Sequence, residues 1–214
     1  MTGHRPSGYR GKRALDLLIG VPALIASLPV QAVIAWRIRR TMGSPMLFRQ
    51  QRPGLHGVPF ELMKFRTMRN PSTEDTSLTD VARVATDAER ITPLGAFLRS
   101  TSLDELPTLI NLVKGDVSLV GPRPLLMSYL DLYTPEQARR HDVRPGLTGL
   151  AQVSGRNALT WEEKFALDVQ YVDRQGLLED LRILARTILL VMRRQGISAD
   201  GAATMPPFEG IGQR

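Results

Sequence analysis

Two adjacent carboxylates, Asp104 and Glu105, lie in the segment TSLDELPTLINLVKGD, residues 101–116. Arg99 stands five residues before Asp104, and three more arginines fall on predicted turns and loops: Arg123, Arg144 and Arg156. Arginine side chains pair well with phosphate oxygens, and a carboxylate can attack phosphorus to form an acyl phosphate. A magnesium ion would let an anionic nucleophile approach an anionic diphosphate. These residue types therefore allow phosphoryl transfer at the acidic pair.

The same pair also has a purely structural interpretation, because acids at the start of a helix are usually caps. The spacing of Ser102 and Glu105 matches a capping box, in which the Glu105 side chain accepts a hydrogen bond from the Ser102 amide. Pro107 conflicts with this helix start, since it would fall just past the first turn and delete a helical hydrogen bond. A helix that begins at Asp104 and ends at Lys114-Gly115 removes the conflict, and its N-terminus also favours phosphate.

Short strands and helices are predicted around this segment. Residues 45–68 predict two strands joined by a turn at Pro53-Gly54, with Lys64 near the end of the second strand. Thr92, followed by proline, predicts the start of a short helix. The sequence DVSLVGPRPLL predicts a strand that leads into a rigid turn carrying Arg123.

Two helices complete the predicted fold, one opened by a capping box at Thr160 and one over residues 178–194. Asp168 and Asp180 on these helices are predicted to be exposed, as most helix acids are. The fold class is α/β, in the α+β sense: a compact domain of helices with a small sheet.

Composition excludes several kinds of site. With 214 residues and 43% hydrophobic content, the chain can bury one sizeable core. It has no cysteine, which excludes disulfides, thiolate metal sites and cysteine nucleophiles, and its three histidines are too far apart in sequence to form a local ligand pair. Any metal is therefore expected to be a hard cation on oxygen ligands. The motifs GxxxxGK[ST], GxGxxG after a strand, GxSxG and HExxH do not occur.

The net charge of +7 is concentrated at one end of the chain. Residues 1–52 hold nine Lys or Arg and one acid, whereas residues 53–214 hold nineteen bases and twenty acids. The near-neutral second region and the 6% aromatic content argue against a nucleic-acid partner.

The basic residues flank an apolar run at residues 14–36, which as a helix would be roughly 35 Å long and could cross a bilayer. Asp16 and Gln31 would be costly in hydrocarbon, and Pro22 and Pro29 favour a kink. Bases at both ends also differ from the one-sided bias of a spanning helix. These features favour a re-entrant helix that enters and leaves on one face.

A cleaved signal peptide, a straight transmembrane span and a buried soluble helix remain alternatives for this run. The absence of a clear small-residue cleavage site argues against the signal peptide. The predicted organisation is a membrane helix with basic flanks at residues 1–40 and a catalytic domain at residues 41–214.

Five segments, in order along residues 11–195, resemble the bacterial sugar transferase family, the small monotopic polyprenol-phosphate phosphoglycosyl transferases. They are KRALDLLIGVPALIASLP, PGLHGVPFELMKFRTM, RSTSLDELPTLINLVKGDVSLVGPRPLL, VRPGLTGLAQVSGRN and WEEKFALDVQYVDRQGLLEDLRIL. The block from DELP to GPRP is highly specific. The C-terminal RRQGISADGAATMPPFEG is most similar to the subgroup that begins N-linked glycan assembly with a bacillosamine-type sugar phosphate.

This resemblance implies a two-step, magnesium-dependent reaction. A UDP-sugar gives its sugar-1-phosphate to an enzyme carboxylate with release of UMP, and undecaprenyl phosphate, a polyprenol phosphate, then accepts the phosphosugar. The implied location is the bacterial inner membrane, with a monotopic attachment and the catalytic domain in the cytoplasm. A homodimer is compatible with the resemblance. The alternative from another class is a membrane-bound binding or scaffold protein whose acidic pair is only a helix cap.

The resemblance also implies roles for individual residues. Asp104 matches the nucleophile and faces the magnesium ion, and Glu105 matches its partner in the dyad. The remaining matches are to positions in the substrate site: Lys64, Arg99, Arg123, Arg156 and Asp180. Two positions depart from the family pattern. Leu28 separates Ser27 from Pro29, where Ser-Pro is common, and Ser154 stands where many members have Asn.

Overall fold

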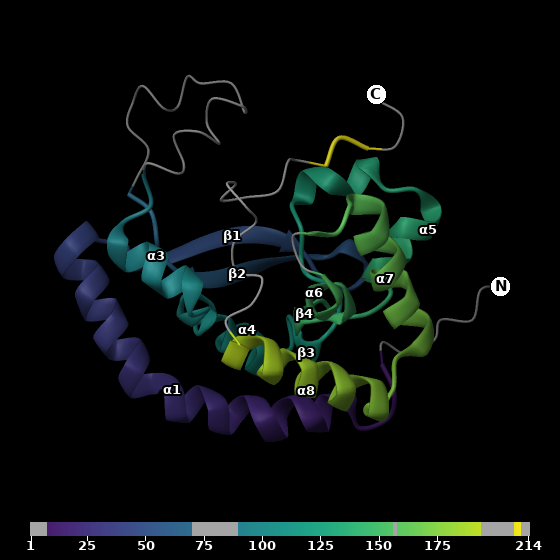
Figure 1. Cartoon of the computed structure of the whole chain (residues 1–214), viewed down its shortest axis with the longest axis horizontal. Helices are drawn as coiled ribbons and strands as arrows, with labels where there is room; N and C mark the ends of the chain where they lie inside the picture. The colour runs from purple at the N-terminus through teal and green to yellow at the C-terminus, as the bar shows by residue number, and fades with distance from the viewer. Residues whose placement is uncertain (1–7, 70–89, 156–157, 194–207, 211–214) are drawn as a thin grey trace.

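The computed structural model describes residues 8–69, 90–155, 158–193 and 208–210 (Figure 1). It confirms the predicted mixture of helices with little sheet, here as two sheets of two strands each. The helices, with η for the 3₁₀ type, are α1 (Lys12–Met42), η1 (Leu55–Gly57), α3 (Pro93–Ser100), η3 (Leu103–Glu105), α4 (Thr108–Lys114), η4 (Met127–Leu132), α5 (Pro135–Ala138), η5 (Arg139–His141), α6 (Leu150–Ser154), α7 (Trp161–Arg174) and α8 (Leu177–Arg193). The strands are β1 (Leu47–Pro53), β2 (Pro59–Phe65), β3 (Ser118–Val120) and β4 (Gly146–Thr148).

The predicted hairpin is confirmed as the antiparallel pair β1 and β2, with Leu47 opposite Phe65. Its connection contains η1, in which His56 adopts a left-handed conformation at φ 55°. The second sheet is the parallel pair β3 and β4, which meet where Gly121 approaches Gly146. A Cβ atom on Gly146 would lie 2.1 Å from the Gly121 amide nitrogen, so the crossing has no room for a side chain.

One large buried cluster joins both sheets to the helices around them. It includes Leu62 of β2, Leu112 of α4, Val120 of β3, Tyr171 of α7 and Ile183 of α8. Since these residues come from strands and helices far apart in the sequence, the cluster fixes the relative positions of the elements that carry the functional side chains.

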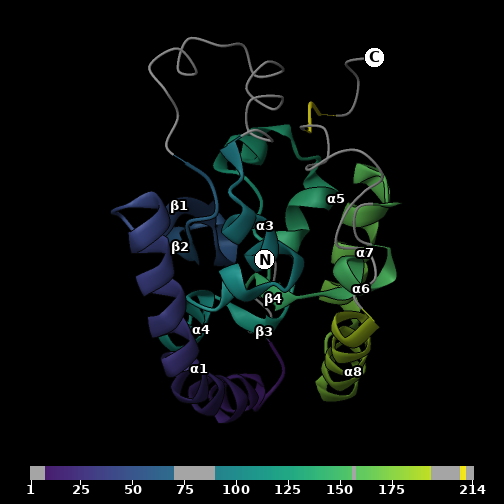
Figure 2. The ribbon, with the colours of Figure 1, turned by 60° about the vertical axis from the view of Figure 1, so that its left-hand side comes forward.

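Helix α1 is bent and contains both Pro22 and Pro29 (Figures 1 and 2). Its first part packs on α4 so closely that a Cβ on Gly20 would lie 2.6 Å from the Leu112 side chain. In its last part, Ile34 and Ile38 are buried in a second cluster with side chains of β2 and α3. Both ends of the helix are therefore attached to the same domain.

The polar residues of α1 that are unfavourable in hydrocarbon have partners inside the protein. Asp16 is buried and accepts hydrogen bonds from the Ser118 hydroxyl and the Leu119 amide, each at 2.9 Å. Gln31 donates to the Ser27 hydroxyl one turn earlier. The large apolar side chains left exposed on the helix are Leu18, Ile19, Val21, Ile25, Leu28, Val30, Val33 and Trp36. Helix α1 is long and apolar enough to cross a membrane, and only 11% of its most apolar stretch is buried against the protein.

The local helix signals were mostly predicted correctly. The Thr92 hydroxyl caps α3 by accepting from the Gly95 amide, and the capping box of Thr160 and Glu163 opens α7. Helix α4 ends at Gly115, which has a positive φ. The predicted exposure of Asp168 and Asp180 is wrong, because both carboxylates are buried in ion pairs.

Candidate functional site

The acidic pair lies in η3, a single 3₁₀ turn between α3 and α4. Ser102 adopts a left-handed conformation at φ 56° and its side chain caps nothing, so the predicted capping box is not formed. The helix also does not begin at Asp104: α4 starts at Thr108, with Pro107 as its N-cap. Pro107 explains the late start, since a proline is tolerated at the beginning of a helix but not inside it.

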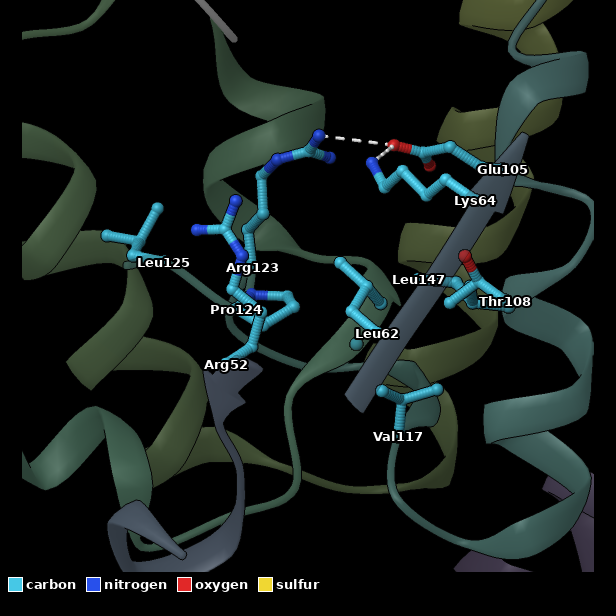
Figure 3. Close-up of a pocket in the computed structure, with 11 residues that line it drawn as sticks. Arg52, Leu62, Lys64, Glu105, Thr108, Val117, Arg123, Pro124, Leu125 and Leu147 are labelled. Atoms are coloured by element: carbon cyan, nitrogen blue, oxygen red, sulfur yellow. Dashed lines mark hydrogen bonds and ion pairs between the residues drawn. The ribbon is translucent and has the colours of Figure 1, made fainter. Parts of the chain in front are cut away.

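The Glu105 side chain instead bridges two cations (Figure 3). Its Oε1 accepts a hydrogen bond from Lys64 Nζ at 2.6 Å and another from Arg123 Nη2 at 3.1 Å. Burial would raise the pKa of Glu105, but the charges of Arg123 and Lys64 outweigh that effect and lower the pKa to about 2. Glu105 is therefore ionised at neutral pH and held in one position.

Asp104 has a different environment from its neighbour. Its carboxylate is half-buried, and no side chain in the described part of the chain forms an ion pair with it. Burial and the negative charge of Glu105 raise the pKa of Asp104, while Lys64 and Arg99 act in the opposite direction. An unpaired carboxylate with a raised pKa is a better nucleophile than one held in a salt bridge.

Contacts between α4 and β2 hold Lys64 and Glu105 together. The Asn111 side chain accepts from the Met63 amide at 3.1 Å and donates to the Glu61 carbonyl at 2.8 Å. The Thr108 hydroxyl donates to the Met63 carbonyl at 2.8 Å. Because these bonds are buried, or nearly so, they fix the distance between the strand that carries Lys64 and the turn that carries Glu105.

Arg123 follows β3 in the predicted Gly-Pro-Arg-Pro turn. Its carbonyl accepts a hydrogen bond from Arg140 Nη2 at 2.8 Å, and Arg140 in turn forms a buried ion pair with Asp168 at 2.7 Å. The Gly146 amide donates to the Pro122 carbonyl at 2.9 Å. The rigid turn is thus tied to β4, η5 and α7, and it directs the Arg123 side chain toward Glu105.

These side chains border a pocket that is lined by both cationic and apolar side chains (Figure 3). Its lining residues are Arg52, Leu62, Lys64, Glu105, Thr108, Val117, Arg123, Pro124, Leu125, Gly146 and Leu147. Three cations and one carboxylate leave an excess of positive charge, so the pocket suits an anion such as a diphosphate.

The other arginines predicted near the site are Arg99, Arg144 and Arg156, and neither Arg99 nor Arg144 lines the pocket. Arg99 is on α3, where its Nε donates to the Thr67 hydroxyl at 3.0 Å while its charge acts on Asp104. Arg144 donates to the Gly115 carbonyl and borders another hollow at the start of α1. Arg156 lies outside the described residues.

Asp180 is not in the pocket but in a buried network at the start of α1. It accepts hydrogen bonds from Lys12 Nζ at 2.6 Å, from the Tyr171 hydroxyl at 2.7 Å and from the Tyr9 hydroxyl at 3.0 Å. Lys12 also donates to the Val120 carbonyl at 3.0 Å. The predicted substrate role of Asp180 stays a prediction, whereas the contacts show a tie between α1 and the rest of the protein.

The donor set around Asp104 fits a magnesium ion that is bound mainly by substrate. Within the described ranges no group of three or more His, Cys, Asp or Glu could hold a metal. Mg²⁺ commonly uses one or two carboxylates together with phosphate oxygens and water. Asp104 supplies one such carboxylate, and the two side-chain hydrogen bonds to Glu105 in the described structure both end on Oε1, which leaves Oε2 as a further oxygen ligand.

Two polar side chains of the pocket, Arg52 and Thr108, were not predicted from the sequence. Arg52 lies next to the predicted turn at Pro53-Gly54, and Thr108 lies within the predicted helix. The alternation of side chains along β1 puts Arg49 and Arg52 on opposite faces of the strand. Which face of β1 lies toward Arg123 depends on the packing of β1 against η4. This packing joins segments that are distant in the sequence, so no local pattern predicts it.

A family model described as bacterial sugar transferase matches residues 8–194. The chain is 47% identical to an uncharacterized sugar transferase, EpsL, of Bacillus subtilis, over 94% of this chain and 96% of that protein. It is 40% identical to the UDP-glucose:undecaprenyl-phosphate glucose-1-phosphate transferase of Caulobacter vibrioides, over 83% of this chain and 68% of that protein. The undecaprenyl-phosphate galactose phosphotransferase of Salmonella typhimurium is 38% identical, over 86% of this chain and 41% of its own length.

Proposed function

The chain belongs to the bacterial sugar transferase family and is a sugar-phosphate transferase; from this premise we propose that it transfers a sugar-1-phosphate from a UDP-sugar to undecaprenyl phosphate, with release of UMP. The observation that carries the proposal is the contrast within the acidic pair. Asp104 has no ion-pair partner in the described structure, whereas Glu105 is held ionised by Lys64 and Arg123 at the border of a cationic pocket.

The proposed reaction has two displacements at the same phosphorus. A carboxylate oxygen of Asp104 attacks the phosphorus that bears the sugar, and the bond from that phosphorus to the bridging oxygen breaks. The bonding electrons leave with UMP, and an acyl phosphate remains on Asp104. An oxygen of undecaprenyl phosphate then attacks this phosphorus, the bond to the Asp104 oxygen breaks, and the free carboxylate is restored.

The surrounding charges support both displacements. Lys64 and Arg123 fix Glu105 and have further N–H donors that would bond phosphate oxygens of the substrate, and Arg99 adds positive charge near Asp104. When bound, Mg²⁺ would be held by Asp104 with phosphate oxygens of the substrate and would neutralise the charge between nucleophile and diphosphate. Glu105 stays ionised because of its low pKa, so in this proposal it positions cations and does not act as a proton donor.

The reaction is tested by incubating purified protein with undecaprenyl phosphate and a panel of UDP-sugars, and measuring UMP. The panel includes UDP-glucose and UDP-galactose, the sugars in the names of two relatives, and a bacillosamine-type UDP-sugar. We expect UMP release together with a polyprenol diphosphate sugar for at least one donor. Absence of UMP with every donor and with Mg²⁺ present would contradict the proposed reaction.

The chain attaches to the inner membrane through α1 as a re-entrant helix, with the catalytic domain in the cytoplasm. This orientation is supported by the attachment of both ends of α1 to one domain, through Lys12 at the start and through Ile34 and Ile38 near the end. A helix held in this way cannot place its ends on opposite sides of a bilayer. Exposed apolar side chains between the two attachments supply the surface for lipid.

Cysteine labelling tests this orientation, because the chain has no cysteine of its own. Single cysteines are placed at Gly8 and at Gly43, one at each end of α1, in cells of the host bacterium. We expect an impermeant maleimide to label neither site in intact cells and both sites after the inner membrane is opened. Labelling of one site alone in intact cells would show a spanning helix and contradict the re-entrant arrangement.

A further inference from the structure

Arg52 is a pocket residue with no acidic partner among the residues that the structure describes. It lies near the end of β1 and lines the same pocket as Lys64, Glu105 and Arg123. Figure 3 shows its guanidinium beside the Arg123 side chain, on the side away from Glu105. Within the described residues, its one hydrogen bond runs from Nη2 to the Gln50 side chain at 2.5 Å, and its buried Nε has no partner.

This arrangement is unfavourable in the absence of an anion. A guanidinium carries five N–H donors and its charge is costly to bury without a counter-ion. Burial and the neighbouring charge of Arg123 lower the pKa of Arg52 to about 10. The contrast with Arg123 is informative, because Arg123 has Glu105 as its partner, whereas Arg52 lines the same pocket and has no carboxylate partner in the described part of the chain.

We propose that Arg52 binds the phosphate that leaves with the nucleotide, as a second arginine beside Arg123. The inference rests on the proposed function, since it concerns the UDP-sugar of that reaction. When the bond between the sugar-bearing phosphorus and the bridging oxygen breaks, the electron pair stays on that oxygen, which leaves as part of UMP. The leaving phosphate thereby gains negative charge, which the spare donors of Arg52 compensate.

The test compares UMP binding with stability in Arg52→Met, which keeps the length of the side chain and removes its charge. UMP affinity is measured by calorimetry on the purified full chain in detergent, and Tm is measured without ligand. Loss of a charged hydrogen bond weakens UMP binding by at least about tenfold. The Tm stays the same or rises, because the substitution removes a half-buried charge that has no counter-ion among the described residues.

Arg49→Met is the matched control, because Arg49 lies on the same strand but its exposed side chain pairs with Glu61 on the other face. This variant is expected to bind UMP as the unmodified chain does. Unchanged UMP affinity in Arg52→Met would overturn the inference and leave the proposed function standing. A lowered Tm in Arg52→Met would also overturn it, since a structural role would then explain any loss of binding. If the unmodified chain does not bind UMP, that result would contradict both this inference and the uridine nucleotide of the proposed function.

Discussion

Replacement of Asp104 by asparagine is expected to reduce UMP release by on the order of a thousandfold or more, because the amide cannot form the acyl phosphate. The side chain keeps nearly the same shape, and Asp104 has no ion pair to lose within the described structure, so the fold should be unaffected. Intact-protein mass spectrometry gives the more direct measurement. The unmodified chain, mixed with Mg²⁺ and its UDP-sugar but no lipid acceptor, should gain the mass of one phosphosugar, and the Asn variant should not.

Asp131→Asn is a suitable control, since Asp131 is exposed on η4 and forms no part of the pocket. It should give the same adduct and the same rate as the unmodified chain. Full activity in Asp104→Asn would contradict the assignment of the nucleophile and favour the alternative of a helix start with no chemical role. UMP release on addition of lipid, but no adduct for any donor, would instead indicate direct transfer between the two substrates.

A pH profile separates the role of Glu105 from that of Asp104. Burial and Glu105 raise the pKa of Asp104, and the proposed nucleophile must be ionised to react, so we expect activity to be lost as the pH falls through that raised pKa. Glu105→Gln removes a negative charge next to Asp104, so the loss of activity at the acid end of the pH profile should occur at lower pH. A loss that stays at the same pH would show that Asp104 is not the titrating nucleophile.

Replacement of Asp180 by asparagine is expected to lower the free energy of unfolding by about 3–5 kcal/mol, the typical cost of leaving one member of a buried ion pair without its partner. Lys12 and Asp180 are both almost inaccessible, with side-chain exposures of 6% and 1%. In the variant, the hydrogen-bond partners of the Lys12 ammonium among the described residues are the Val120 carbonyl, the Tyr171 hydroxyl and the new amide, and none of them carries a charge. Urea unfolding in detergent, followed by circular dichroism, measures the change.

Two further variants show whether the effect belongs to the ion pair. Glu179→Gln changes the acid that precedes Asp180 in the chain and pairs with the exposed Arg182. It should change the free energy of unfolding by less than about 1 kcal/mol. Lys12→Met combined with Asp180→Asn removes both charges and should recover part of the loss. If Asp180→Asn is as stable as the unmodified chain but has a raised KM for the UDP-sugar, then Asp180 contacts substrate and the network is not its main role.

The features that could be predicted from the sequence are those decided by neighbours along the chain. The hairpin of residues 45–68 is confirmed because its turn and strand residues are contiguous, and Thr92, Thr160 and Gly115 mark helix boundaries through contacts within a few residues. The acidic pair at Asp104 and Glu105 was likewise evident from its residue types. The apolar run of α1, with its prolines and basic flanks, was also recognisable, since its length and composition alone show that it is long and apolar enough to cross a membrane.

The errors have a common physical cause, which is competition between local and distant partners. Ser102 and Glu105 have the spacing of a capping box, yet Lys64, 41 residues away, and Arg123 on a later turn attract the Glu105 carboxylate more strongly than a backbone amide does. Asp168 and Asp180 have the pattern of exposed helix acids, but Arg140 and Lys12 are brought to them by packing. Charge pairs of this kind have no periodicity that a sequence could display.

The residue types of the candidate site could thus be recognised in the sequence, whereas the tertiary structure decided which charged side chains contact one another. The residue types near Asp104 allowed phosphoryl transfer before any geometry was known. Only packing of β1 and β2 against α4 and the turn after β3 showed that Arg123 and Lys64 pair with Glu105. The same packing showed that, among the described residues, neither Asp104 nor Arg52 has an ion-pair partner at the pocket. Local order follows from short-range hydrogen bonds, whereas the position of a charge follows from burial of surfaces that are distant in the chain.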